Sequence, residues 1–82
     1  MQLNIEFEET AFRHKIKRED ILWAFHHYHY DGQMEDDENK FIRIGFDRSG
    51  NLLEVMYNER KNFVNIFHAM ICRSIYYPLL DL

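Results

Sequence analysis

The stretch that decides the fold is Phe41–Ala69, which reads FIRIGFDRSGNLLEVMYNERKNFVNIFHA. Residues 41–46, 52–57 and 63–69 alternate apolar and polar side chains, which is the period of a strand with one buried face. The segments between them, 47–50 and 58–62, are rich in turn-forming Asp, Asn, Ser and Gly. The stretch therefore predicts a three-stranded antiparallel meander.

The turn lengths also predict how the strands pair. A four-residue loop at 47–50 would place Ile44 opposite Leu53, and a two-residue loop at 60–61 would place Leu53 opposite His68. Directly opposed residues share a face of the sheet, so we expect these three side chains to lie side by side. The predicted core face carries Ile42, Ile44, Phe46, Leu53, Val55, Tyr57, Val64 and Ile66.

The same register places Arg43 opposite Glu54 on the other face. A slip of one residue would bury these two charged side chains, so we expect the register to be well specified. This other face is also too apolar for water alone, and we expect a terminal segment or a partner to cover it. Its apolar residues are Phe41, Leu52, Met56, Phe63 and Phe67.

The flanking segments complete an α+β domain. Residues 2–7 alternate as a strand does, and apolar residues from 17 to 29 recur at helical spacing, which predicts a helix on the core face. Ser74 can cap a short C-terminal helix that holds Pro78 in its first turn. We therefore expect one domain over residues 1–82: an N-terminal strand, a helix, the meander and a short C-terminal helix.

Composition narrows the class of protein. With 82 residues, 46% of them hydrophobic and 16% aromatic, the chain can pack one core and leaves room for a homodimer or a complex. Cys72 is the only cysteine, which favours a reducing compartment. No signal segment opens the sequence, and no apolar run approaches the ~18 residues of a membrane span, so we expect a cytoplasmic protein.

The net charge of −4 counts against a general nucleic-acid binder. Five of the fourteen acidic residues, however, lie in residues 31–38. This stretch opens with Asp31-Gly32 and is expected to be a loop, with a strand fragment around it as the alternative. Without this stretch the net charge is +1. A basic cluster near the start could follow a phosphate backbone, or it could be a solvated loop and helix start. Its members are Arg13, Lys15, Lys17 and Arg18.

Three histidines, His26, His27 and His29, come just before the acidic stretch and raise the question of a metal site. Neighbouring helical residues point about 100° apart, which suits the fixed geometry of zinc poorly. We therefore expect no metal and no cofactor, and a metal-dependent enzyme using residues 26–37 is the less favoured alternative. Taken alone, His68 reads as a structural histidine, and the residues by themselves indicate a small binding or hydrolytic domain.

A series of short motifs nevertheless runs through the chain in a recognisable order. They are His14-Lys15-Ile16, Glu19-Asp20-Ile21 with Ala24, Arg43-Ile44-Gly45, residues 47–55, residues 66–70, Arg73, Tyr76 and Leu79. Their order and spacing, from about Phe12 to Leu80, resemble the BrnT-type toxins of bacterial toxin–antitoxin pairs, part of the RelE-like ribonuclease group. The resemblance implies a RelE-like α+β fold.

The chain departs from that family at the motif ends. The family has glycine after the histidine, where this chain has Lys15, and a strand end I-S-A-R in which serine falls on His68 and arginine on Met70. These departures concern catalysis more than the fold. Arg73, one turn further on, could supply the missing cation.

The resemblance implies an endoribonuclease that cleaves mRNA without a metal and is neutralised by a ribbon-helix-helix antitoxin. Such cleavage needs a base for the ribose 2′-hydroxyl, a cation for the phosphate and an acid for the leaving oxygen. At the matching positions, His14 and His68 would transfer protons, because histidine titrates near neutral pH, and Arg43 and Arg73 would contact phosphate. The alternative is a non-catalytic binding module or a decayed toxin that acts only through a partner.

Overall fold

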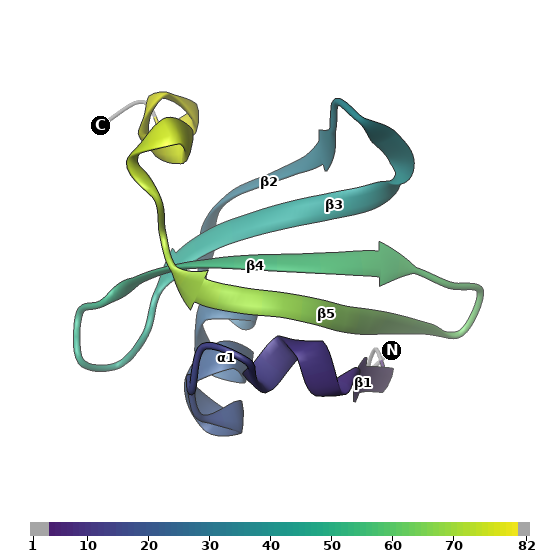
Figure 1. Ribbon diagram of the computed structural model, residues 1–82, viewed down its shortest axis with the longest axis horizontal. Helices are drawn as coiled ribbons and strands as arrows, with labels where there is room; N and C mark the ends of the chain where they lie inside the picture. Colours follow the sequence, from purple (N-terminus) through teal and green to yellow (C-terminus); the bar gives the residue numbers. More distant parts are fainter. Residues whose placement is uncertain (1–3, 81–82) are drawn as a thin grey trace.

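The computed structural model describes residues 4–80, in which a five-stranded sheet carries α1 on one face and η2 on the other (Figure 1). In chain order the elements are β1 (Asn4–Phe7), the 3-10 helix η1 (Glu9–Phe12), α1 (Arg18–His26), β2 (Tyr28–Met34), β3 (Asp37–Phe46), β4 (Leu52–Glu59), β5 (Phe63–Ile71) and the 3-10 helix η2 (Ser74–Leu80). The predicted α+β class is confirmed. Residues 2 and 3 of the predicted first strand lie outside the described residues.

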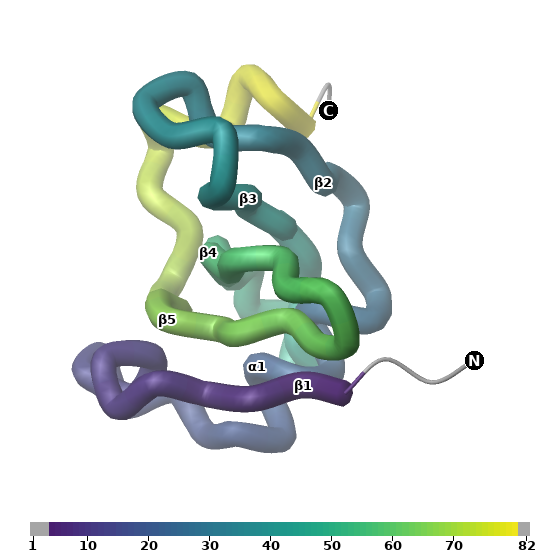
Figure 2. Tube along the Cα trace, turned by 90° about the vertical axis from the view of Figure 1, so that its right-hand side faces the viewer, coloured from purple at the N-terminus to yellow at the C-terminus, as the bar shows by residue number. Residues whose placement is uncertain are grey.

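The strand order is β1-β5-β4-β3-β2, and β1 runs parallel to β5 while the other pairs are antiparallel. The meander of β3, β4 and β5 is as predicted, and Figure 2 shows its strands stacked between β1 and β2. None of the helices between residues 4 and 80 has the length and apolar character needed to cross a bilayer.

The helix predicted to run to His29 ends earlier, and the acidic stretch predicted as a loop is mostly strand, with a turn at 35–36. The helix ends at His26, and residues 28–34 form β2, which pairs with β3 at the sheet edge. Gly45 permits this close junction, because a Cβ there would lie 2.6 Å from the backbone oxygen of Ala24. Asp31-Gly32 thus lies within a strand rather than at a break.

The predicted strand register is also wrong, by one residue between β3 and β4. Ile44 pairs with Glu54, and Gly45 pairs with Leu53. The cause is the turn: Asp47 accepts backbone hydrogen bonds from Ser49 (2.9 Å) and Asn51 (2.8 Å), which draws Asn51 into the loop. The loop is therefore one residue longer than predicted.

Between β4 and β5 the pairing departs from the prediction for two reasons. The turn lies one residue later than the predicted 60–61, because the N–H of Arg60 donates to the oxygen of Phe63 (2.8 Å) and Glu59 pairs with Val64, and a bulge then shifts the pairing once more. Met56 pairs with His68, but Tyr57 pairs with Ile66, so Phe67 is the extra residue. His68 consequently shares a face with Met56, and Leu53 pairs with Ile71 instead. The expected row of Ile44, Leu53 and His68 does not exist.

The apolar residues form two layers rather than one core face. The layer under α1 comprises Ala11, Ile21, Ala24, Phe25, Leu53, Val55, Tyr57, Val64, Ile66 and Ala69, with Phe41 packed against it. The layer under η2 comprises Ile42, Ile44, Met56, Cys72 and Leu80, with Leu52 and Phe67 packed against it. The C-terminal segment is thus what covers the second face, and Ile42 and Ile44 belong there.

Candidate functional site

The segment after β1 is fastened along β5, and this places His14. The backbone N–H of Glu8 donates to the oxygen of Ile66 (2.9 Å), and the Thr10 hydroxyl donates to the oxygen of Phe67 (2.6 Å). The exposed ring of His14 then lies edge-on to the ring of His68, with the two centroids 5.5 Å apart. Two imidazoles distant in sequence thereby meet on the η2 face of the sheet.

The chain leaves this position through a left-handed turn. Lys15 has φ 63, a conformation that glycine adopts readily and that costs other residues roughly 1–2 kcal/mol. Its N–H donates to the oxygen of Phe12 (3.0 Å), which closes the turn before α1 begins. The turn keeps His14 on one side of the sheet while α1 packs on the other.

Glu54 is fully buried beside Ile44 and is bonded to two basic side chains. Its Oε2 lies 2.9 Å from Nε2 of His68 and 2.6 Å from Nη2 of Arg73. Nε of Arg73 donates to both carboxylate oxygens (3.1 and 3.2 Å), and the backbone N–H of Arg73 donates to Oε1 (2.8 Å). The carboxylate therefore sits in a cage of donors.

These donors keep Glu54 ionised. Burial alone would raise the pKa of the carboxyl, but the hydrogen bonds from His68 and Arg73 outweigh it and lower the pKa to about 2. The hydrogen bonds to Glu54 in turn raise the pKa of Arg73. Near neutral pH the site thus contains a carboxylate and a guanidinium locked together.

The ionised carboxylate fixes the orientation of His68. Since a carboxylate only accepts hydrogen bonds, Nε2 of His68 must carry a hydrogen and donate it to Glu54. Within residues 4–80, no group is hydrogen-bonded to Nδ1 of His68, and a fifth of the side chain is exposed. Nδ1 is therefore the nitrogen that can exchange a proton with a bound molecule.

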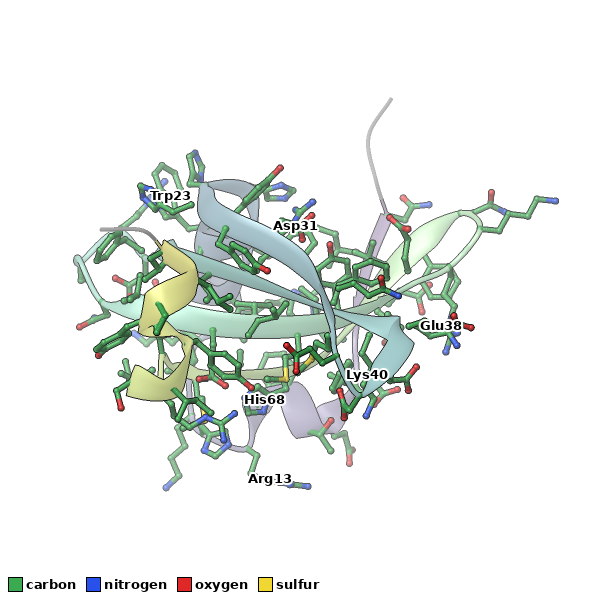
Figure 3. All side chains as sticks on the ribbon, turned by 90° about the horizontal axis from the view of Figure 1, so that it is seen from above. Arg13, Trp23, Asp31, Glu38, Lys40 and His68 are labelled. Carbon is green, nitrogen blue, oxygen red and sulfur yellow. The ribbon has the colours of Figure 1, made fainter. Side chains whose placement is uncertain are left out.

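An open depression of about 410 Å³ lies over these groups and is lined by Glu8, Thr10, Arg13, His14, Met56, Phe67, His68 and Arg73. Figure 3 shows Arg13 and His68 in the lower half of the view, and Trp23 and Asp31 in the upper half. The lining includes two arginines and two histidines but one carboxylate, that of Glu8, which accepts a hydrogen bond from Asn65 (2.8 Å). Such a lining can bind an anion and transfer protons to it.

Of the four residues predicted to be catalytic, the structure brings His14, His68 and Arg73 together and places Arg43 elsewhere. Arg43 lies on the α1 face, with its guanidinium carbon 4.1 Å from the ring centre of Phe25 and 4.2 Å from that of Tyr28. It donates to Asp31 (3.2 Å) and to the oxygen of Phe25 (3.1 Å). The predicted pairing of Arg43 with Glu54 is wrong.

The polar groups around Arg43 are hydrogen-bonded to one another. The Tyr57 hydroxyl donates to Asp31 (2.6 Å), and burial together with this bond raises the pKa of Tyr57. The aromatic rings and Asp31 hold Arg43 from several sides, which is the environment of a structural arginine.

The predicted nucleic-acid-binding cluster is exposed but not continuous with the depression. Only Arg13 of its members lines it. Arg18 instead covers the ring of Phe7 (4.7 Å to the ring centre), and Lys15 and Lys17 occupy the turn before α1.

The three histidines considered as possible metal ligands, His26, His27 and His29, contact different neighbours. His27 stacks on Trp23 with ring centroids 3.9 Å apart, His26 lies edge-on to Phe25, and His29 lies edge-on to Phe46. No group of three or more metal-ligating side chains is found among residues 4–80.

The residue that sequence reasoning missed is Glu54. The predicted register sets it opposite Arg43 and puts His68 on the other face of the sheet, so it assigns Glu54 neither of its partners, His68 and Arg73. One signal bears on the wrong partner: the Asp47 carboxylate can bond to backbone N–H groups further along a turn and lengthen it, which removes Arg43 from its place opposite Glu54.

Comparison with known proteins found no relative of this chain: no family model, no curated protein and no solved structure matches it.

Proposed function

We propose that this chain is a metal-independent endoribonuclease, the toxin of a cytoplasmic toxin–antitoxin pair that a ribbon-helix-helix antitoxin neutralises. The observation that carries the proposal is the pairing of His68 with the buried, ionised Glu54 in a depression that also holds His14, Arg13 and Arg73. These are the groups that phosphodiester cleavage through a 2′-hydroxyl needs.

The geometry suits His68 as the base. Nδ1 of His68 removes the proton of a ribose 2′-hydroxyl, and the oxygen attacks the adjacent phosphorus. The imidazole becomes positively charged as it does so, and the carboxylate of Glu54 at Nε2 stabilises that charge. Glu54 is therefore a positioning residue, which acts through His68.

His14 suits the role of acid. Its exposed ring stands beside His68, so it can donate a proton to the 5′-oxygen as the bond from phosphorus to that oxygen breaks. The products are a 2′,3′-cyclic phosphate and a free 5′-hydroxyl. The exposed part of Arg73, with Arg13, offsets the negative charge that builds up on the phosphate oxygens.

One position at which the sequence differs from the BrnT-type toxins nevertheless supports the likeness, because its backbone conformation is one that suits the family's residue. Lys15 stands where that family has glycine, and its φ of 63 is a conformation that glycine favours. The same likeness assigned a phosphate contact to Arg43, and we leave that residue out of the proposed site because it lies on the opposite face.

A second function, a non-catalytic binding module, is favoured by one observation. Arg73 gives two of its guanidinium nitrogens to Glu54, so less of its charge is free for a substrate. In that case Glu54, His68 and Arg73 would only hold η2 against the sheet.

The test is cleavage of labelled single-stranded RNA by the purified chain in the presence of a chelator. We expect fragments with cyclic phosphate ends, and inhibition by the product of a neighbouring ribbon-helix-helix gene. His27→Ala serves as the matched control for substitutions of His68, because His27 is an exposed imidazole outside the depression. A pure chain that leaves RNA intact would favour the binding module.

A further inference from the structure

A second hollow lies on the η2 face, between η2 and the hairpin of β2 and β3. It measures about 480 Å³, and its lining includes Glu35, Asp36, Ile75, Tyr76 and Leu79. We call it the hairpin groove. Figure 1 shows η2 and the hairpin at the top of the molecule, away from α1 and β1.

The groove exposes apolar surface that the fold does not use. Ile75 is 69% exposed and Leu79 is 40% exposed, although both are on η2, whose Tyr76 and Leu80 pack against the core. Side chains of this kind on a rigid wall contribute to binding when a partner removes them from water.

The charged side chains that line the groove are all acidic. Glu35 and Asp36 are exposed at the hairpin turn, and Asp37 and Glu38 follow them directly. A partner with acidic groups would be repelled, and a purely apolar partner would strip water from the carboxylates without replacing it. Complementarity therefore requires apolar side chains flanked by Lys or Arg.

The same rim disfavours other occupants. In a symmetric dimer built on this groove, Glu35 and Asp36 of one copy would approach those of the other, and like charges would meet. A nucleic acid or an anionic membrane surface would bring phosphates against the same carboxylates.

We infer that the hairpin groove is the docking site for a basic, apolar-patterned segment of another protein. The groove neighbours the catalytic depression, since the guanidinium carbon of Arg73 lies 5.5 Å from the ring centre of Tyr76. The inference uses only the shape and charge of the groove, so it stands or falls independently of RNA cleavage.

The experiment is selection of a displayed library of random short peptides on the full chain, followed by affinity measurements on the enriched peptides. We expect these to carry Leu, Ile or Phe flanked by Lys or Arg, and to bind more weakly as salt rises. Ile75→Asp, and separately the double change Glu35→Lys with Asp36→Lys, should each weaken binding about tenfold or more.

Matched controls separate the groove from the rest of the surface. Ile71→Asp alters an apolar side chain that is 52% exposed but outside the groove, and Glu6→Lys with Glu59→Lys makes the same charge change on β1 and β4. Both controls should bind the peptides as the unaltered chain does. Because Ile75 is so exposed, its substitution should leave the unfolding transition in place.

Three results would overturn the inference. One is enrichment of peptides without basic residues, or of none at all. Another is equal binding to the Ile75→Asp chain. The third is sedimentation of the unaltered chain as a dimer that Ile75→Asp converts to a monomer, since a second copy would then occupy the groove.

Discussion

Oε2 of Glu54 lies 2.9 Å from Nε2 of His68, and no part of the Glu54 side chain reaches solvent. A buried carboxylate without partners would take up a proton, but this one accepts bonds from two basic side chains and a backbone N–H. The pair is therefore both a stabilising contact and a device that orients an imidazole.

The first prediction concerns acid stability. The pKa of Glu54 is lowered from 4.5 to about 2 in the folded chain, so its ionised form favours the fold. This contribution, about 3 kcal/mol, should be complete above pH 4.5 and should disappear as the pH falls toward 2. Urea unfolding at a series of pH values measures it.

Glu54→Gln is the control for that measurement. Asp47 also has a lowered pKa, because the hydrogen bonds from Asn51, Ser49 and Gly50 outweigh its burial, and it contributes to acid sensitivity. The difference between the two chains isolates Glu54. It should be large at neutral pH and shrink below pH 4.5, and a constant difference would contradict the assigned ion pair.

The second prediction concerns cleavage. His68→Ala should lower the rate of RNA cleavage by about 10²–10⁴-fold, since it removes the proposed base, with little change in RNA binding. Cleavage rates under single-turnover conditions and binding by fluorescence anisotropy separate the two quantities. Equal rates for His68→Ala and the unaltered chain would remove His68 from the mechanism.

The third prediction concerns Arg43, which the resemblance placed at the phosphate. Arg43→Lys should lower the free energy of unfolding by roughly 1–3 kcal/mol, because lysine cannot stack between the Phe25 and Tyr28 rings while bonding to Asp31. Cleavage per folded molecule should stay the same. A selective loss of cleavage at unchanged stability would return Arg43 to the active site.

The sequence predicted which segments form strands better than it predicted the register in which those strands pair. Alternation in residues 41–69 was sufficient for the meander, since a period of two is typical of strands. Each strand has one face toward α1 and one toward η2. Both faces are apolar, however, so alternation could not tell which residues share a side. Register then depended on three local features: the first turn, which Asp47 lengthens, the second turn, which lies one residue later than predicted, and the bulge at Phe67.

For the candidate site too, part could be predicted from the sequence and part depended on how the strands pair. His14, His68 and Arg73 were selected by resemblance and meet in the structure, although they come from a turn, a strand and the start of the C-terminal segment. Glu54 could not be assigned from local pattern, because a carboxylate in a strand usually points to solvent. Only the long-range pairing of β4 with β5 makes it a buried partner.

The fourth prediction concerns the turn after His14. Lys15→Gly should raise the free energy of unfolding by up to about 1 kcal/mol, since glycine adopts a φ of 63 without strain. Lys15→Ala is the matched control, because alanine removes the same charge but keeps the Cβ that makes a φ of 63 unfavourable. Thermal unfolding of both variants measures the effect. A gain shared by both would trace it to lost positive charge rather than to the turn.

The fifth prediction concerns Gly45, where the end of α1 crosses β3. A Cβ at this position would lie 2.6 Å from the backbone oxygen of Ala24 and 3.0 Å from that of His27, and neither can move without unwinding the helix end. Gly45→Ala should therefore lower the free energy of unfolding by about 2–3 kcal/mol.

Gly50→Ala is the comparison: a Cβ there meets nothing within 4 Å, and only its φ of 86 makes alanine unfavourable, by roughly 1 kcal/mol. Urea unfolding of the two variants should rank them in this order, because contact with rigid backbone adds to the cost at Gly45 alone. The reverse order would mean that α1 does not approach β3 as closely as this packing requires.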